Sequence, residues 1–292
     1  MKPWLAAIAV IPFALSASSA RAADDTAIAR GAYIFAAADC GTCHTDTKNN
    51  GAPLAGGRAL VTAFGTFYTP NITPDPVNGI GRWSLADFRH ALRDGEGRNG
   101  EYLYPVFPFG SYTGMSDDDI ADLYAYLMAQ KPEPVPDKVD QIKFPFEFRP
   151  LLLAWRLLYF MPGPLPPVAR ESPQWNRGRY LSEAVVHCQE CHTPRNFLGA
   201  LKTSGHAYAG NPNGPDRVRS PNITPDNDTG IGQWSLADIA TVLKTGQTPN
   251  LDAVGRQMSD VVKGTTLLTE SDRLAIAVYL KSLPPLHATP RN

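Results

Sequence analysis

The sequence predicts a mainly α-helical protein built from two tandem copies of one unit. Residues 71–95 and 222–246 are identical at 15 of 25 aligned positions, which indicates an internal duplication. No segment shows the sustained alternation of apolar and polar residues that is typical of a half-buried strand, whereas several carry apolar residues at helical intervals. The 27 prolines and 24 glycines predict long irregular loops between these helices.

The composition fits two folded domains of ordinary size. The chain has 292 residues, of which 43% are hydrophobic and 19% are charged, so it can bury normal cores and is not a disordered chain. The formal net charge is -1, which leaves no basic excess to neutralise phosphates. Nucleic acid is therefore excluded as the main partner.

Residues 1–22 have the form of a secretory signal peptide. Lys2 precedes an apolar stretch at residues 4–15, and Ala20-Arg21-Ala22 is a small-x-small cleavage pattern. A membrane anchor is the weaker interpretation, because the apolar run is shorter than the roughly 20 residues that span a bilayer. We expect cleavage before Ala23 and export to the periplasm, where disulfides are permitted.

Each unit is expected to contain three helices in the same order. The first comes before a cysteine motif, the second has a serine capping box and ends at a glycine, and the third opens with a Ser/Thr-x-x-Asp cap. The helices are expected to begin at equivalent places in the two units: residues 25 and 173, 84 and 235, and 116 and 269. These signals place the first domain at residues 23–130 and the second at residues 173–292.

The linker at residues 131–172 differs in composition from both units. Residues 131–138 are rich in proline, and residues 144–160 are strongly apolar and aromatic. We interpret the apolar segment as a helix that lies across both units. Docking of a partner protein or a peripheral membrane contact is the alternative interpretation, because exposed apolar patches often serve that purpose.

The four cysteines lie in two matching motifs, each followed at once by histidine. The motifs are Cys40-Gly-Thr-Cys43-His44 and Cys188-Gln-Glu-Cys191-His192. Disulfides, a zinc site or a redox dithiol are the alternatives for such cysteines. Cys-x-x-Cys-His is the attachment pattern of c-type haem, in which two thiols bind the vinyl groups and the imidazole reaches the iron. We therefore predict two covalently bound haem c groups, with His44 and His192 as axial ligands.

The sixth iron ligand separates an electron carrier from a catalyst, because an open iron can bind peroxide or a gas. Met115 and Met258 each lie shortly before the last helix of their unit, and this matching placement predicts iron ligation. Met128 falls inside the last helix of the first unit, where a thioether usually fills the core. Met161 falls in the linker.

The remaining polar candidates show weaker patterns. Neither His90 nor His187 has a histidine at the equivalent place of the other unit, so both are interpreted as surface or packing residues. Arg58 and Arg195 are interpreted as solvated loop cations, with contacts to haem propionates as the alternative.

The motifs together resemble those of a known family. The two Cys-x-x-Cys-His motifs, the Asn-Ile-Thr-Pro-Asp blocks with Gly-Ile-Gly-x-Trp-Ser-x-x-Asp, and the Tyr-Leu-Lys-Ser-Leu-Pro-Pro at residues 279–285 are similar to the cytochrome c subunits of periplasmic alcohol, gluconate and aldehyde dehydrogenases. The resemblance covers nearly the whole chain after residue 22. It implies two tandem class I cytochrome c-like domains with His and Met axial ligands.

The resemblance also implies partners. Such subunits carry electrons from a catalytic flavin, pyrroloquinoline quinone or molybdenum subunit towards a quinone or a terminal oxidase, at the outer face of the inner membrane. The sequence departs from the family in two ways. Family members commonly have three haem units where this chain has two motifs, and many have a methionine at the place of Phe107. Met115 is the nearest substitute for that ligand.

Two functions follow from these observations. The first is a periplasmic dihaem cytochrome c that passes single electrons and is not itself an enzyme, with both irons capped. The alternative is a dihaem peroxidase-type enzyme with one open iron. Phe107 in place of a methionine is the feature that favours the alternative.

Overall fold

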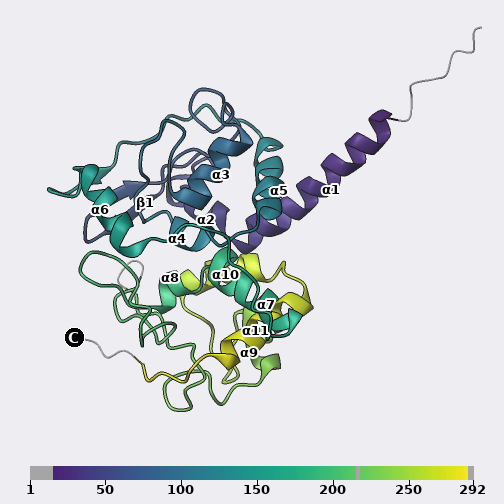
Figure 1. Ribbon diagram of the computed structural model, residues 1–292, viewed down its shortest axis with the longest axis vertical. Helices are drawn as coiled ribbons and strands as arrows, with labels where there is room; N and C mark the ends of the chain where they lie inside the picture. The colour runs from purple at the N-terminus through teal and green to yellow at the C-terminus, as the bar shows by residue number, and fades with distance from the viewer. Residues whose placement is uncertain (1–15, 215–217, 289–292) are drawn as a thin grey trace, which may run out of the picture.

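The computed structural model describes residues 16–214 and 218–288. Two groups of helices lie one beside the other, the first unit in purple and blue and the second in green and yellow, with α1 (Ser16–Ala37) extending away from the first unit (Figure 1). Helix α1 begins ahead of the predicted residue 25 and runs through the expected cleavage site, while residues 1–15 of the expected signal peptide lie outside the described residues.

The predicted mainly helical class is confirmed, and both units share one core plan. In the first unit α1 packs on α5 (Asp117–Met128), and in the second α7 (Pro173–Tyr180) packs on α11 (Glu270–Ser282). A glycine permits each crossing: a Cβ atom on Gly31 would lie 1.9 Å from the Asp122 carbonyl oxygen, and one on Gly178 would lie 1.9 Å from that of Ala275. The glycine of the repeated Arg-Gly-x-Tyr sequence is therefore required because the helix backbones touch there.

The middle helix of each unit forms as the capping signals predict. Helix α3 (Leu85–Asp94) begins after Ser84, and α9 (Leu236–Thr245) begins after Ser235, each with both hydrogen bonds of a capping box. Gly95 and Gly246 end these helices in the left-handed conformation, with φ values of 62° and 73°.

Several elements differ from the sequence prediction. The helix predicted to begin at residue 173 is α7 followed by one π-helical turn, η2 (Leu181–Val185). Helix α10 (Arg256–Thr265) precedes α11 and was not predicted. Short helices complete the two units: α2 (Cys40–His44), η1 (Thr47–Asn49), α4 (Phe109–Tyr112) and α8 (Gln189–His192).

A small antiparallel sheet, which the sequence did not predict, attaches the linker to the first unit. Strands β1 (Ala59–Thr62) and β2 (Gly65–Tyr68) form a hairpin, and β3 (Gln141–Ile142) from the linker pairs with β2. These strands are too short for a clear alternation of apolar and polar residues.

The linker helix α6 (Pro150–Tyr159) contacts both units, as the helix interpretation of residues 144–160 predicts. The Trp155 indole nitrogen donates to the Leu198 carbonyl oxygen of the second unit at 3.0 Å. Arg156 donates to the Asp94 carbonyl oxygen of the first unit. The outer face of α6 is open to solvent, where Leu157 is 78% and Leu158 is 69% exposed. In the part of the chain that the structure describes, no helix is long and apolar enough to cross a membrane.

Candidate functional site

Each cysteine motif forms a short helix directly after a residue with a left-handed backbone. Asp39, before Cys40, has a φ of 52°, and His187, before Cys188, has a φ of 46°. This conformation is uncommon for residues other than glycine and separates the motif from the preceding helix. Asp39 and His187 occupy equivalent places in the two units. The backbone thus presents both motifs in the same way.

The four cysteines are free, and their surroundings do not favour thiolates. Burial raises the pKa of Cys40 and of Cys188 to about 12, and that of Cys191 to about 11. A redox-active dithiol needs the opposite, a lowered pKa in an electropositive site. The described residues include no group of three or more His, Cys, Asp or Glu side chains that could hold a metal ion between them.

The two motif histidines have the same hydrogen bond. The Nδ1 atom of His44 lies 2.8 Å from the Pro70 carbonyl oxygen, and that of His192 lies 2.7 Å from the Pro221 carbonyl oxygen. Because a carbonyl oxygen only accepts, each Nδ1 carries the proton and each Nε2 keeps a free lone pair. Burial lowers the pKa of both imidazoles, although the proline carbonyls act in the other direction. Both imidazoles are therefore neutral, with a fixed tautomer and with Nε2 available to a metal ion.

The repeated Asn-Ile-Thr block explains how the proline carbonyls are held. The Asn71 side-chain oxygen accepts from both the main chain and the hydroxyl of Thr73, at 2.9 and 2.7 Å. Its amide nitrogen donates to the Glu133 carbonyl oxygen at 2.8 Å, beyond the end of α5. Asn222 makes the equivalent bonds to Thr224 and to the Leu286 carbonyl oxygen. Each asparagine thereby ties the residue after the proline to the chain that follows the last helix.

The two candidate methionines differ in burial, although both pack with the core. Met115 is 0% exposed, and its carbonyl oxygen accepts from the Arg93 guanidinium at 2.7 Å. Met258 lies on α10 and packs against the same core cluster, which Cys40 and Cys188 also contact. Phe107 is part of this cluster as well, 5.5 Å from Tyr112 between ring centroids.

The other methionines have different surroundings. Met128 packs against the core at the end of α5, and Met161 in the linker is 88% exposed. Met161 lies in the linker, as the sequence indicates, and its thioether is open to solvent.

Known proteins with similar sequences identify the family. The sequence pattern of the cytochrome c family matches residues 28–131. A protein of Cereibacter sphaeroides named "Diheme cytochrome c-type" is 44% identical over 265 residues, which are 88% of this chain and 86% of that protein. The chain belongs to the cytochrome c family. The free Cys-x-x-Cys-His motifs and the oriented imidazoles fit the covalently bound haem c of that family.

This cytochrome is also similar to subunits of larger assemblies. The fructose dehydrogenase cytochrome subunit of Gluconobacter japonicus is 41% identical over 88% of the chain. The cytochrome c subunit of a quinone alcohol dehydrogenase from Gluconobacter oxydans is 38% identical over 96% of the chain. The chain spans 52% and 59% of the length of these two relatives.

The sequence did not predict two arginine contacts at the motifs of this cytochrome. The Arg58 guanidinium donates to the carbonyl oxygen of Thr42, inside the first motif. Arg195 pairs with the carboxylate of Glu190, inside the second. Arg195 is exposed, as the interpretation as a solvated loop cation predicts, and Arg58 is half-buried, but each also makes a hydrogen bond to a motif. The arginines lie at different offsets from their histidines, so the sequence repeat gave no signal for this shared role.

The two motifs of the cytochrome face each other across the contact between the units. His187, before the second motif, has its Nε2 atom 3.3 Å from the Ala38 carbonyl oxygen, just before the first. Ser111 of the first unit donates to the Glu190 carboxylate of the second motif at 2.8 Å. His187 is therefore a packing residue, as predicted, but its contact is between units.

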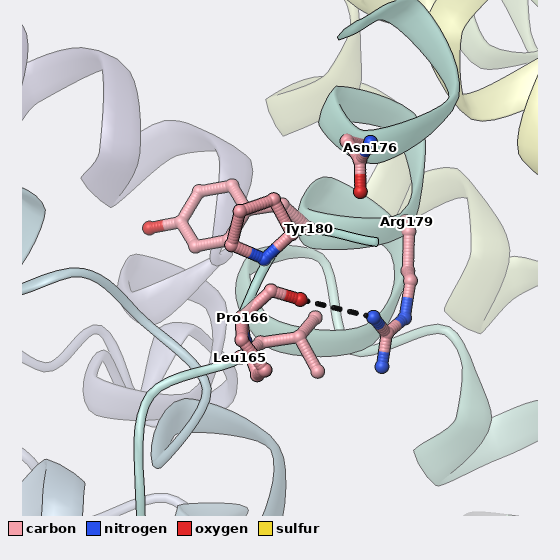
Figure 2. A pocket seen from close by; sticks show the side chains of 6 residues that line it. Leu165, Pro166, Asn176, Arg179 and Tyr180 are labelled. Atoms are coloured by element: carbon pink, nitrogen blue, oxygen red, sulfur yellow. Dashed lines mark hydrogen bonds between the residues drawn. The ribbon is translucent and has the colours of Figure 1, made fainter. Parts of the chain in front are cut away.

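A pocket of about 200 Å³ lies beside α7 in the cytochrome (Figure 2). Its lining residues come from the linker and from α7: Leu165, Pro166, Pro167, Asn176, Arg179 and Tyr180. None of them belongs to a cysteine motif, and Arg179 donates to the Pro166 carbonyl oxygen at 3.2 Å across it. The pocket is therefore separate from the motif histidines.

Proposed function

We propose that this chain holds two haem c groups and passes single electrons. Cys40 and Cys43 bind one group through thioether bonds, and Cys188 and Cys191 bind the other. His44 and His192 are the proximal ligands. When bound, haem iron supplies reversible one-electron chemistry. The proposal rests mainly on one hydrogen bond in each unit, from the motif histidine to a proline carbonyl oxygen. This bond places the proton on Nδ1 and leaves Nε2 available to the iron.

Met115 and Met258 complete the proposed ligand set. Met115 lies in the core cluster that Cys40 and Cys188 contact, and Met258 packs against that cluster; each precedes the last helix of its unit. A thioether at the sixth position closes the iron to peroxide and to other small molecules. This chain is then a carrier with no reaction of its own on a substrate.

The electron donor proposed for this chain is a dehydrogenase catalytic subunit. Support comes from the relatives, which are named as cytochrome subunits of fructose, alcohol and gluconate dehydrogenases. The donor would carry a flavin, pyrroloquinoline quinone or molybdenum cofactor, and the acceptor would be a quinone or a terminal oxidase. We place the chain in the periplasm at the outer face of the inner membrane. The exposed face of α6, with Leu157 and Leu158, supports a peripheral contact there.

Reduction by a dehydrogenase tests this function. The exported chain is purified under mild conditions from its native host, and the copurifying dehydrogenase is identified by mass spectrometry. Adding that enzyme's substrate to the complex is expected to reduce the cytochrome, while the isolated chain shows no peroxide turnover. Peroxide turnover at the rate of a true peroxidase, together with a five-coordinate reduced haem, would instead support the peroxidase-type enzyme.

A further inference from the structure

A tyrosine of the first unit completes the start of the last helix of the second unit. The Tyr33 hydroxyl, on α1, donates to the Asp272 carboxylate at 2.6 Å. The same oxygen accepts from the Thr269 main-chain N–H at 3.0 Å. Thr269 is the N-cap of α11, so the tyrosine satisfies a donor at a helix terminus that has no partner within its own helix.

A tyrosine of the second unit makes the equivalent contact to the start of the last helix of the first unit. The Tyr180 hydroxyl, at the end of α7, donates to the Asp119 carboxylate and accepts from the Ser116 main-chain N–H at 3.1 Å. Ser116 is the N-cap of α5. Figure 2 shows the Tyr180 side chain turned away from Arg179, with its hydroxyl directed to the ribbon of the first unit.

The two contacts are equivalent by sequence as well as by geometry. Tyr33 and Tyr180 end the two Arg-Gly-x-Tyr repeats, and Asp119 and Asp272 end the two Ser/Thr-x-x-Asp caps. A reciprocal contact between equivalent residues has the form of a two-fold interface between subunits, here within one chain.

Helix packing follows the same reciprocal pattern. Helix α10 of the second unit packs on α1 of the first, and α4 of the first unit packs on η2 of the second. A Cβ atom on Gly264 would lie 2.0 Å from the Ala36 carbonyl oxygen, and one on Gly114 would lie 3.0 Å from the Ala184 Cβ atom. The units therefore meet at close range on both sides of the pseudo-two-fold axis.

This arrangement places the cysteine motifs at the contact. Ser111 bonds to Glu190 inside the second motif, and His187 approaches Ala38 just ahead of the first. The reciprocal tyrosines and the facing motifs belong to the same interface, so loss of the tyrosine contacts loosens the placement of the motifs.

We propose that Tyr33 and Tyr180 are positioning residues for electron transfer between the two units. Each hydroxyl holds the final helix of the opposite unit, and the pair fixes the motifs in one mutual orientation. The inference rests on the proposed function, because it requires a haem group in each unit. Neither tyrosine is a catalytic residue, since both act through the interface.

The test uses the full-length exported holoprotein with the double substitution Tyr33→Phe and Tyr180→Phe, which removes only two hydroxyl groups. Pulsed electron paramagnetic resonance of the oxidised protein measures the iron-to-iron distance, and rapid partial reduction measures electron redistribution between the haems. We expect one narrow distance in the unsubstituted chain. In the double variant a second, longer distance appears, internal transfer slows several-fold, and the spectrum of each haem is unchanged.

A matched control is Tyr124→Phe, since that hydroxyl donates at 2.8 Å to the Trp83 carbonyl oxygen within the first unit. This variant is expected to keep the original distance and the original internal rate. The single variants Tyr33→Phe and Tyr180→Phe are expected to act similarly because their contacts are equivalent, and they carry the test if the double variant does not fold.

The outcomes separate the two proposals. A double variant with the original distance and internal rate would overturn the positioning role of the tyrosines. Failure of the proposed function would be visible earlier, as an unsubstituted chain with fewer than two haems and no iron-to-iron distance.

Discussion

The Nδ1 atom of His44 lies 2.8 Å from the carbonyl oxygen of Pro70, and His192 stands in the same relation to Pro221 at 2.7 Å. The two pairs come from separate copies of a repeat, and in each the proline directly precedes an asparagine that ties it to the end of the unit. Main-chain acceptors of this kind fix the orientation and raise the basicity of a metal-bound histidine.

Substituting these asparagines is expected to change one reduction potential at a time. In Asn71→Ala the Pro70 carbonyl is held less firmly, so His44 becomes a weaker donor and the potential of the first haem rises. Loss of a hydrogen bond worth about 1 kcal/mol corresponds to roughly 40 mV for one electron. Redox titration of Asn71→Ala and Asn222→Ala measures the shift, and in each variant the other haem is the control. A shift of both potentials in either variant would contradict this role.

The axial methionines are tested by removing them singly. Met258→Ala is expected to convert one haem to the high-spin form and to halve the near-infrared band of methionine-bound haem, with the other haem unchanged. Met115→Ala is expected to do the same for the other haem. Met128→Ala is the control because Met128 packs at the end of α5. An unchanged spectrum in Met115→Ala would show that Met115 only fills the core, with Met128 or His90 the next candidate.

A helix crossing through backbone contact leaves no room for a side chain. Gly178→Ala would place a Cβ atom 1.9 Å from the Ala275 carbonyl oxygen, so we expect a loss of at least about 2 kcal/mol in the free energy of unfolding. Gly110→Ala is the matched control, since no atom beyond its chain neighbours and its own helix backbone lies within 4 Å of the added Cβ. Denaturant unfolding of the two holoproteins measures the difference. Equal stability would show that α7 and α11 can move apart at no cost.

Acid is expected to weaken the second unit through Asp272. Burial raises the pKa of this carboxyl, but hydrogen bonds from Arg177 and Tyr33 outweigh burial and hold it below the ordinary value of 3.8. A carboxyl with a lowered pKa stabilises the folded state above its unfolded pKa, and that stability is lost as the pH falls through the folded value. Unfolding measured from pH 6 down to pH 2 should therefore show a smaller loss of stability in Asp272→Asn than in the unsubstituted chain. Identical pH dependence of the two proteins would mean that ionisation of Asp272 does not contribute to the stability of the folded state.

Much of the fold could be predicted because the duplication repeats its local signals. The capping boxes at Ser84 and Ser235 and the glycines that end both helices formed as the sequence indicates. Leu181–Val185 became a π-helical turn, which no helix propensity distinguishes from an α-helix. Strand β3 depends on pairing with a hairpin more than 70 residues earlier, and two residues carry no periodic pattern.

The parts of the site that could be predicted are those whose residues lie close together in the sequence. The cysteines and their histidines stand within five residues of one another, so their spacing alone indicates haem attachment. The proline carbonyls are main-chain groups, and no residue type signals a carbonyl acceptor. The contacts of Tyr33 and Tyr180 join residues of different units, although the repeated tyrosine and the repeated capping aspartate were visible. The repeated sequence does not show that each tyrosine bonds to the capping aspartate of the opposite unit and not to that of its own.

Haem content after denaturation tests the central claim most directly. The exported chain is purified, extracted with acid acetone and weighed by mass spectrometry under denaturing conditions. The proposal predicts that both haems stay with the polypeptide and that the mass exceeds that of the processed chain by two haem groups. Release of haem into the acetone, or free thiols or a disulfide at Cys188 and Cys191, would contradict it.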